Sequence, residues 1–357
     1  MPEHTMYAYW KTQPDILEDI FTKRKELTAR FVHLFLDTKP EHLYLVGSGT
    51  SFNAISAAAP FIEETLGIAV RTVMPSRLPA VFGRRPLIVY LSQGGSSTNT
   101  LAAMDALAAY PSIVITGEED SEIARRGANH MLIGCGPEFA GPKTAGYTSS
   151  VLILYLCALE SALASGAMPQ PRHDGITATL ACLAADARVN IARTEMWFTR
   201  NQQELLAVQK YILTGRGFAG AVAVEGALKL LETIKVPAIG FEFEEYLHGP
   251  ILMTDAALGG VFFISEDPEV KPRMVELARC HQRYSRFTYT VTRDDAIQGD
   301  RVLHLQMSGN PFTEVFEFVL MPQLLAARVP GLLGIADGSE VYDAYTGACA
   351  TKYNNGR

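Results

Sequence analysis

Short apolar stretches alternate with helical segments along the whole sequence, five stretches in each half. They are nearly continuously apolar, which is typical of parallel strands that helices cover on both faces. The ten predicted strands are 43–46, 69–73, 87–91, 112–115 and 131–133, then 211–214, 238–243, 260–264, 287–291 and 302–306. This pattern predicts an α/β fold with two doubly wound parallel-sheet domains of the flavodoxin or Rossmann type.

Helical periodicity surrounds the strands. It predicts helices over 14–36 and 312–327 and one long connecting helix over 177–206. The last twenty residues are rich in Gly, Asp, Asn and Tyr and predict an extended tail. The predicted organisation is a helical segment at 1–40, a first domain at 41–170, a connecting helix at 171–206, a second domain at 207–335 and a tail at 336–357.

The two halves share one local pattern when the sequence is shifted so that Gly47 falls on Gly215. In each copy an apolar run meets a Gly-x-Gly turn, and an alanine-rich helical segment follows. The same shift places Gly49 on Gly217, Glu64 on Glu232 and Thr65 on Thr233. We interpret this pattern as an internal duplication.

The composition is that of an ordinary globular protein, with 48% apolar and 19% charged residues among 357. This excludes a disordered, collagenous or coiled-coil protein, and the length suggests two domains. The net charge of −7 argues against nucleic acid as a partner.

Several features predict a soluble, cytoplasmic protein without a membrane partner. The N-terminus lacks a basic region followed by an apolar run, so no signal peptide is visible. The most apolar stretch, 151–164, is too short to span a bilayer and contains Glu160. The five cysteines form no CxxC pair, which indicates reduced and mostly buried thiols.

Two loops of the first half are rich in glycines and hydroxyls. They are 47–51 and 92–100, and each follows a predicted strand, at the sheet edge where ligands of parallel sheets bind. Glycines let the backbone approach an anion closely, and Ser and Thr hydroxyls donate to its oxygens. The two loops predict a phosphate site built without lysine, and the alternative is a pair of ordinary Gly/Ser turns.

Motifs for cofactors and metals do not fit the sequence. A dinucleotide-binding GxGxxG would need glycine where Phe52 stands, and no GK[ST] follows a glycine-rich loop. The eight histidines show no HxxxH or HxH spacing, and His248 lies among glutamates without a second histidine nearby. We therefore predict no cofactor and no metal.

The second half carries the candidates for acid–base chemistry. Glu225, Lys229 and Glu232 are spaced to share one helix face, which on composition alone describes a solvated, salt-bridged stripe. His248 begins a His-Gly-Pro turn further along the chain. A carboxylate and a histidine beside one phosphate site are what proton transfer next to a carbonyl needs, although spacing does not show that they meet.

Five segments carry a family resemblance: LYLVGSGTSFNA (43–54), LSQGGSSTNT (91–100), CGPEFAGPKTAGYTSS (135–150), GRGFAGAVAVEGALKLLETI (215–234) and EFEEYLHGP (242–250). They fall in order over nearly the whole chain. The sequence resembles the sugar isomerase (SIS) domain family, and most of all the isomerase half of glucosamine-6-phosphate synthase and related amino-sugar-phosphate isomerases and deaminases.

The resemblance implies a site for a 6-phosphorylated sugar or amino sugar. Glu232 would transfer the proton between C1 and C2, and His248 would assist ring opening by reaching into the neighbouring subunit of a homodimer. Lys352 has the same distance from the C-terminus as the family's tail lysine and would form a Schiff base or close over the substrate. The residues assigned to phosphate and substrate binding are Thr50, Ser51, Ser92, Gln93, Ser97, Glu225 and Lys229.

The sequence departs from the family pattern in three places. Gly94 stands where the family has a second serine, and the tail lacks the family's Asp-x-Pro-Arg stretch. Only the short segment 1–40 precedes the first strand, without an N-terminal cysteine nucleophile, so we expect no glutaminase activity.

These features leave three functions open. The first is an isomerase that interconverts aldose and ketose forms of a 6-phosphorylated sugar or amino sugar, with or without deamination. The second is a deglycase that splits a fructosamine 6-phosphate. The third is a non-catalytic regulator that senses a phosphosugar, although the segment 1–40 holds no basic recognition helix.

Overall fold

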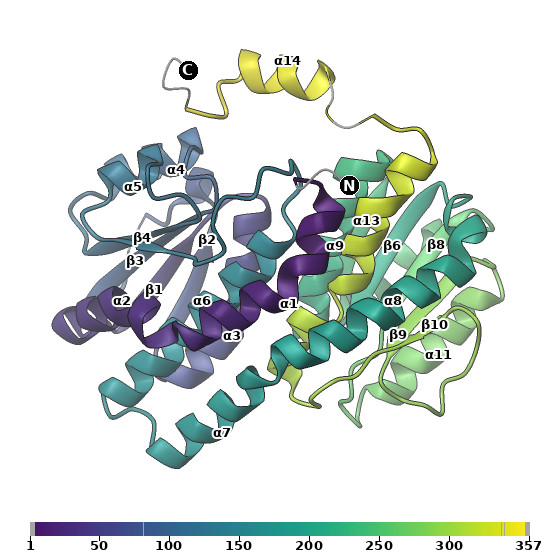
Figure 1. The fold of residues 1–357 in the computed structure, drawn as a ribbon, viewed down its shortest axis with the longest axis horizontal. Coiled ribbons are helices and arrows are strands. Elements are labelled where there is room, and N and C mark those ends of the chain that lie inside the picture. Colours follow the sequence, from purple (N-terminus) through teal and green to yellow (C-terminus); the bar gives the residue numbers. More distant parts are fainter. Residues whose placement is uncertain (1–3, 81, 337, 339, 354–357) are drawn as a thin grey trace. The chain divides into compact units, whose positions relative to one another are not determined.

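The computed structural model describes residues 4–80, 82–336, 338 and 340–353, which form two compact units (Figure 1). The first-sheet unit consists of Asp15–Ala181 together with the C-terminal segment that begins at Gly338. The second-sheet unit consists of the residues up to Pro14 and the chain from Cys182 onward to that segment. Each unit contains one sheet.

The first-sheet unit contains five parallel strands in the order β2-β1-β3-β4-β5. The strands are β1 (His42–Val46), β2 (Ala69–Val73), β3 (Pro86–Ser92), β4 (Ser112–Thr116) and β5 (His130–Leu132). The helices of this unit are α2 (Arg24–Thr38), α3 (Thr50–Leu66), η1 (Pro75–Arg77), α4 (Thr98–Ala106), α5 (Glu122–Arg126), α6 (Ala145–Ala164), α7 (Gln170–Ala181) and α14 (Glu340–Ala348). The three central strands are buried almost throughout, which explains their continuous apolar sequence.

The second-sheet unit repeats this order as β7-β6-β8-β9-β10, again all parallel. The strands are β6 (Lys210–Gly215), β7 (Ala238–Glu242), β8 (Leu258–Phe263), β9 (Thr288–Thr292) and β10 (Val302–His304). Its helices are α8 (Leu183–Leu205), α9 (Phe218–Ile234), α10 (Phe243–Leu247), η2 (Pro250–Met253), α11 (Lys271–Gln282), η3 (Pro311–Thr313), α12 (Glu314–Glu317) and α13 (Leu320–Leu332). Both sheets therefore have the flavodoxin-type order, and all ten predicted strands are confirmed with small differences at their ends.

The predicted duplication is confirmed in the backbone of the two Gly-x-Gly turns. Gly49 caps α3 with φ 55° and ψ −131°, and Gly217 caps α9 with φ 57° and ψ −121°. The two helices have the same length, 17 residues each. A side chain is strained at such positive φ values, so glycine is required at the same point of both copies.

Two predicted helices are interrupted. The segment 14–36 belongs to α1 (Met6–Thr22) and α2, which are separated at Lys23, where ψ of 9° departs from the helical value. The predicted connecting helix 177–206 is likewise two helices, α7 and α8, with ψ of −16° at Cys182 between them. Neither break lies at a proline or a glycine, the residues that would have indicated it in the sequence.

The prediction of an extended tail is wrong for part of the tail, because Glu340–Ala348 form the helix α14. Glu340 and Asp343 lie in its first turn, where a negative charge stabilises a helix N-terminus. After α14 the chain turns at residues 349–350, and the course of the described residues that follow is given with the site below.

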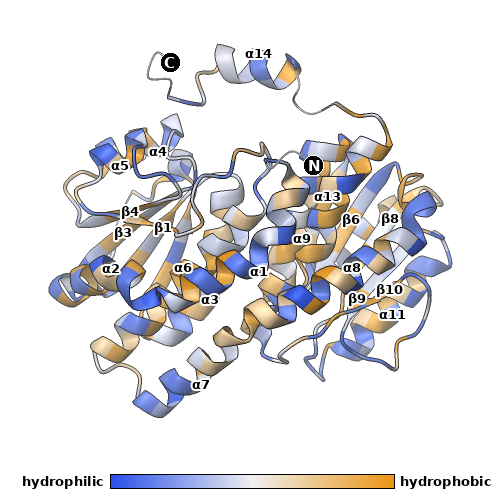
Figure 2. Ribbon diagram, viewed as in Figure 1, coloured by the Kyte–Doolittle hydropathy of each residue, from blue (hydrophilic) through white to orange (hydrophobic). Residues whose placement is uncertain are grey.

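Two segments are long and apolar enough to cross a membrane by length and composition, Ala145–Ala164 and Pro311–Leu332. The expectation that the stretch 151–164 is too short is therefore wrong, because its helix α6 has 20 residues. The apolar windows are 89% and 78% buried, as in core helices, and Figure 2 shows hydrophobic colour along much of α13. Both segments are core helices of their units.

The prediction about cysteine burial is only partly right. All five cysteines are free. Cys157 is buried, whereas Cys135 and Cys280 are half-buried, and Cys182 and Cys349 are exposed. Most of the thiols are thus not buried.

Candidate active site

The two predicted phosphate loops meet at the carboxyl edge of the first sheet. They follow β1 and β3, which are neighbours in that sheet. Asn99 in the second loop donates from Nδ2 to the Ser48 Oγ of the first, at 2.9 Å. Ser51 lies in the first turn of α3 with Thr50 before it, and Ser92 ends β3.

Three serines of these loops have hydroxyls without a protein partner among the described residues. Ser51 and Ser92 are buried, and Ser97 caps α4 through its backbone without a side-chain hydrogen bond. The two loops therefore offer free donors beside two helix N-termini, which is the donor set that an anion needs.

Gln93 is fixed in place by its surroundings. Its carbonyl oxygen accepts from Gly117 N at 2.8 Å, and its side-chain Nε2 donates to Ser150 Oγ at 3.3 Å. A Cβ at position 146 would lie 2.3 Å from Gln93 Nε2, so a larger residue there would displace the Gln93 amide. Gln93 thus fastens the second loop to the start of α6.

The C-terminal chain returns to the same loop after α14. Lys352 and Ser97 form an antiparallel bridge, and Tyr353 N donates to the Ser96 carbonyl oxygen at 2.8 Å. Thr98 also binds the tail. Its backbone N donates to the Thr351 carbonyl oxygen at 3.3 Å, and its Oγ1 donates to the Ala350 carbonyl oxygen at 2.9 Å. The tail is therefore attached to the predicted phosphate loop by its backbone.

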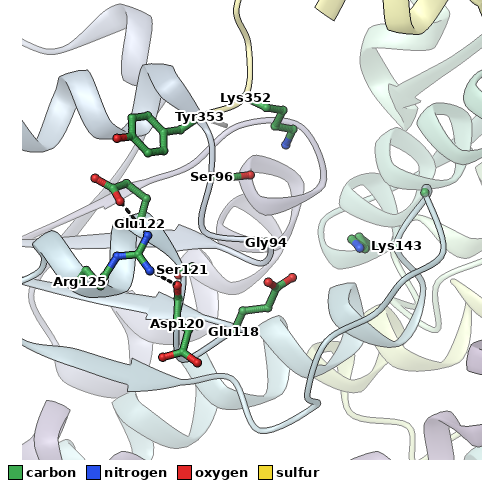
Figure 3. Close-up of a pocket in the computed structure, with 11 residues that line it drawn as sticks. Gly94, Ser96, Glu118, Asp120, Ser121, Glu122, Arg125, Lys143, Lys352 and Tyr353 are labelled. Carbon is green, nitrogen blue, oxygen red and sulfur yellow. Dashed lines mark hydrogen bonds and ion pairs between the residues drawn. The ribbon is translucent and has the colours of Figure 1, made fainter. Parts of the chain in front are cut away.

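A cavity of about 760 Å³ lies beside this attachment in the first-sheet unit (Figure 3). It is lined by the loops after β3, β4 and β5 and by the tail. The lining residues are Gly94, Ser96, Glu118, Asp120, Ser121, Glu122, Arg125, Gly141, Lys143, Lys352 and Tyr353. Of the predicted site residues, Lys352 lines this cavity. Gln93 and Ser97 each adjoin a lining residue in the sequence, and Ser92 lies one residue further away.

Lys143 is a cavity residue that the sequence reasoning missed. Its Nζ donates to the carbonyl oxygens of Glu138 and, at 3.2 Å, of Ala140. The predicted phosphate site was expected to lack lysine, yet two lysines line the adjoining cavity. Burial of the amino group and the neighbouring charge of Lys143 lower the pKa of Lys352, although the residue as a whole is exposed. The only signal for Lys143 was its place in segment 135–150.

Gly94, which stands where the family has a serine, has open space where a side chain would begin. A Cβ built there would meet only Glu118 Oε1, at 3.9 Å, and the φ of Gly94 is not in the left-handed region. The backbone therefore accepts a serine at this position. The missing hydroxyl is a feature of the sequence and not a requirement of the loop.

The acid–base candidates lie in the second-sheet unit, on α9. Glu225 and Lys229 are 0% and 1% exposed, while the Glu232 side chain is 38% exposed. Lys229 Nζ lies 2.6 Å from Glu232 Oε2 and 3.6 Å from Glu225 Oε1. The three do share one face, but a solvated stripe is wrong, because the ammonium group links one buried and one accessible carboxylate inside the unit.

His248 follows the last residue of α10 and is exposed. Gly249 next to it has φ 142°, which turns the chain into η2. Among the described residues no hydrogen bond joins His248 to Glu232. The exposed apolar residues Ile251 and Leu252 follow after Pro250, and Leu252 is 88% exposed.

A buried carboxyl pair lies in α12 of the second-sheet unit. Burial, with the neighbouring charge of Glu317, raises the pKa of Glu314 to about 8, and burial raises that of Glu317 to about 7. Ser265 donates to Glu314 at 3.3 Å, and Thr313 donates to Glu317 at 2.9 Å. Over the described part of the chain, no group of three or more His, Cys, Asp or Glu side chains is arranged to hold a metal.

Comparisons with known proteins agree on one class. The sequence is 28% identical over 270 residues to an Arabidopsis thaliana glutamine–fructose-6-phosphate aminotransferase, covering 74% of this chain and 39% of that protein. It is 30% identical to the Gloeobacter violaceus protein of the same name, covering 71% of this chain and 43% of that one. The chain thus spans about two fifths of the length of these relatives. No protein-family model matches it.

The fold agrees with these sequence matches. It superimposes on the C-terminal domain of glucosamine–fructose-6-phosphate aminotransferase from Francisella tularensis with a TM-score of 0.82 and 21% identity, over 94% of this chain and 98% of that domain. Fold and sequence matches together indicate a two-domain α/β protein with the sugar isomerase (SIS) fold. The chain is a homologue of the isomerase (SIS) part of the glutamine–fructose-6-phosphate aminotransferases.

Proposed function

We propose that this protein is an enzyme that acts on a 6-phosphorylated sugar or amino sugar, moving a proton between C1 and C2. The observation that carries the proposal is the attachment of the tail to the hydroxyl-rich loop. It brings an amine, Lys352, next to a set of unpartnered hydroxyls suited to phosphate. A phosphate group and a carbonyl on one small molecule are the two groups that such a site binds.

The phosphate would bind to Ser51, Ser92, Gln93 and Ser97, with Thr50 nearby. Hydroxyls and backbone amides at helix N-termini hold an anion whatever the net charge of the protein. Phosphate binding would fix the substrate by its C6 end and leave the C1–C2 end for chemistry. Binding energy from this remote group then serves to orient the reacting atoms.

The proton transfer is assigned to Glu232, with Glu225 and Lys229 as its supports. Lys229 holds the Glu232 carboxylate at 2.6 Å, so its orientation is fixed by a buried cation. The accessible carboxylate would take the proton from one carbon and return it to the next. Lys352 would form a Schiff base with the open-chain carbonyl, which acidifies the adjacent C–H bond.

A homodimer is part of the proposal. His248 is exposed and is followed by the exposed apolar residues Ile251 and Leu252, whose burial would favour a protein contact. In such a dimer, His248 would serve ring opening in the site of the neighbouring subunit. Mixing inactive Glu232→Gln and His248→Ala proteins should then restore part of the activity, and no recovery after verified subunit exchange would contradict a shared site.

A deglycase for fructosamine 6-phosphates is the second candidate. The observation that favours it is the pair of carboxylates Glu118 and Asp120 in a cavity of about 760 Å³, where an amine substituent can be accommodated. The same proton transfer at C1 and C2 would serve this reaction.

The deciding experiment is a coupled assay of the purified chain. The substrates are fructose 6-phosphate, glucosamine 6-phosphate, galactosamine 6-phosphate and several fructosamine 6-phosphates, with the unphosphorylated sugars as controls. We expect turnover of at least one phosphorylated substrate and none of its unphosphorylated form. Tight phosphosugar binding without turnover of any of them would instead indicate a sensor. The cytoplasmic location and the lack of a glutaminase activity stay predictions.

A further inference from the structure

The cavity of the first-sheet unit holds two lysines from different parts of the chain. Lys352 comes from the tail and Lys143 from the loop between β5 and α6, and both line the cavity (Figure 3). Among the described residues, no carboxylate lies within ion-pair distance of either Nζ. Two like charges that line one cavity disfavour each other's protonated form.

The two lysines differ in how they are held. The ammonium group of Lys143 donates to two carbonyl oxygens of its own loop, those of Glu138 and Ala140. That loop is itself fixed, because the buried Glu138 carboxylate accepts from Thr144 N and Gly146 N, both at 2.8 Å. No such acceptors hold the amino group of Lys352 in the described part of the chain. Lys143 is therefore the member of the pair whose amino group is held in a fixed position.

We propose that Lys143 is a positioning residue of the active site, whose fixed positive charge favours the neutral form of the Lys352 amine, the form that attacks a carbonyl carbon. The inference rests on the proposed function, in which Lys352 forms a Schiff base. An amine next to another cation is a known way to obtain a nucleophilic lysine near neutral pH.

The step conserves atoms and charge. The proton that leaves the Lys352 ammonium goes to solvent, and the nitrogen lone pair forms a bond to the substrate carbonyl carbon. The C=O π electrons move to oxygen, which takes the proton that the attacking nitrogen releases. The hydroxyl then leaves as water with one proton from solvent while the nitrogen lone pair forms the C=N bond, which gives a protonated imine, and no oxidant or reductant is needed.

Other charged groups also face this cavity. Glu118 and Asp120 come from the loop after β4, and Glu118 and Lys352 point into the cavity from opposite sides in Figure 3. Glu122 and Arg125 of α5 form an ion pair with each other at 2.9 Å. Despite these carboxylates, the pKa of Lys352 is lowered by its burial and by Lys143.

The test measures the Lys352 amine directly in the substrate-free full chain. Trace labelling with acetic anhydride over a range of pH, read by peptide mass spectrometry, gives the pH at which Lys352 becomes reactive. Lys23, whose pKa is raised by its ion pair with Asp19, serves as the internal reference. The variants are Lys143→Gln and Lys143→Met, which remove the charge, and Lys143→Arg, which keeps it.

We expect the neutral variants to move Lys352 labelling to higher pH. At neutral pH the labelling would fall about two- to fivefold, as the loss of one nearby charge in a partly solvated site predicts. Lys143→Arg should label like the wild type, and Lys23 should be unchanged in all. The rising limb of kcat/KM with pH should move in the same direction in the neutral variants.

Three outcomes would overturn the proposal. One is an unchanged Lys352 labelling curve in both neutral variants, and another is Lys143→Arg behaving like Lys143→Gln. The third is weaker binding of inorganic phosphate with unchanged labelling, which would make Lys143 a phosphate ligand. Borohydride reduction in the presence of a phosphosugar substrate would trap a Schiff base at Lys352. A shifted labelling curve without such an adduct would overturn the proposed Schiff base and leave the charge coupling in place. The two failures are therefore distinguishable.

Discussion

The two sheets have the same strand order, but the loops at the carboxyl ends of their strands carry different side chains. In the first copy, a hydrogen bond between Ser48 and Asn99 joins the loops after β1 and β3. In the second copy, residue 216 occupies the position of Ser48, and Arg216 forms an ion pair with Asp267 at 2.6 Å. The same two loops are thus joined by a neutral contact in one copy and by opposite charges in the other.

The sheet registers extend this comparison to the predicted phosphate loop. Tyr90 of β3 corresponds to Phe262 of β8, so Gln93 corresponds to Ser265 and Gly94 to Glu266. The Glu266 carboxylate is paired with Lys271 at 3.0 Å and Arg293 at 3.3 Å. The second copy thus has ion-paired carboxylates where the Gly/Ser loop of the first copy leaves room for a phosphate. After the duplication the two copies thus kept the same backbone, whereas the side chains of these loops came to differ in chemistry.

The largest expected effect distinguishes Glu232 from its counterpart in the first copy, Glu64. Glu232→Gln should lower turnover about 10²- to 10⁴-fold, because it removes the base and keeps the fold. Its phosphosugar affinity, measured by titration calorimetry, should stay within about twofold, since we propose that the phosphate binds elsewhere. Glu64→Gln is the matched control, because Glu64 is exposed and pairs with Arg172, and it should leave turnover unchanged. Equal loss in both variants would contradict the assignment.

The next effect concerns the buried cation of the second copy. Lys229→Met should destabilise the protein by about 3–5 kcal/mol, because it leaves the Glu225 carboxylate buried without this lysine. The first copy has Phe61 at the corresponding position, stacked on Tyr155 with ring centroids 4.0 Å apart. Urea unfolding measures the change. The double variant with Glu225→Gln should recover part of the stability, and a single variant as stable as the wild type would show that the buried ammonium is not needed.

Phosphate affinity should distinguish the loops of the two copies. Ser92→Ala should weaken the binding of a 6-phosphorylated sugar about 10-fold, because it removes one donor to a charged group. Ser265→Ala removes a hydroxyl from the loop after β8 and should leave this affinity unchanged. Both are read by calorimetric titration of the same ligand. Similar losses would mean that the phosphate does not bind to the first copy alone.

The buried carboxyls of α12 should make stability depend on pH. Glu314 and Glu317 have pKa values of about 8 and about 7, above the ordinary value of 4.5, so the folded state binds more protons than the unfolded state between these limits. Stability should therefore fall as the pH rises from about 4.5 to about 8. Glu314→Gln should raise the melting temperature at pH 8 by a few degrees and have less effect at pH 5. Calorimetric scans at the two pH values check this, and a larger gain at pH 5 would contradict it.

The smallest effect is expected at Gly94. Gly94→Ser adds a hydroxyl where a Cβ has open space, and it should tighten phosphosugar binding by about two- to fivefold. Gly94→Ala is the control, because it adds a Cβ without a donor and should leave the affinity unchanged. Weaker binding in both variants would show that the ligand occupies the space above Gly94.

The sequence predicted the strands well because burial on both faces leaves a local signature of continuous apolar residues. The hydroxyl loops were also predictable, since they follow two of those strands directly. The breaks at Lys23 and Cys182 were not, because neither residue has a special backbone preference. The burial of Glu225 and Lys229 was missed for a related reason, because residues on a solvent-exposed helix face and on a buried one have the same spacing.

Lys143 shows a second limit of the sequence. It reaches the cavity because the Glu138 carboxylate fixes a loop by hydrogen bonds to Thr144 and Gly146, and because the tail returns from the far end of the sequence. Neither relation has a spacing or a composition that a sequence pattern records. The charge environment of Lys352 therefore depends on contacts that only the folded chain displays.

The first-sheet unit is discontinuous in the sequence, since its C-terminal segment returns after the second-sheet unit. During synthesis, its five strands can pair long before that segment leaves the ribosome. A partial chain that ends before Ala350 would contain both sheets and yet lack the backbone bonds to Ser96 and Thr98. The order of translation thus places the closing of this cavity after the synthesis of both sheets. Truncated or stalled products would be folded molecules with an unfinished site.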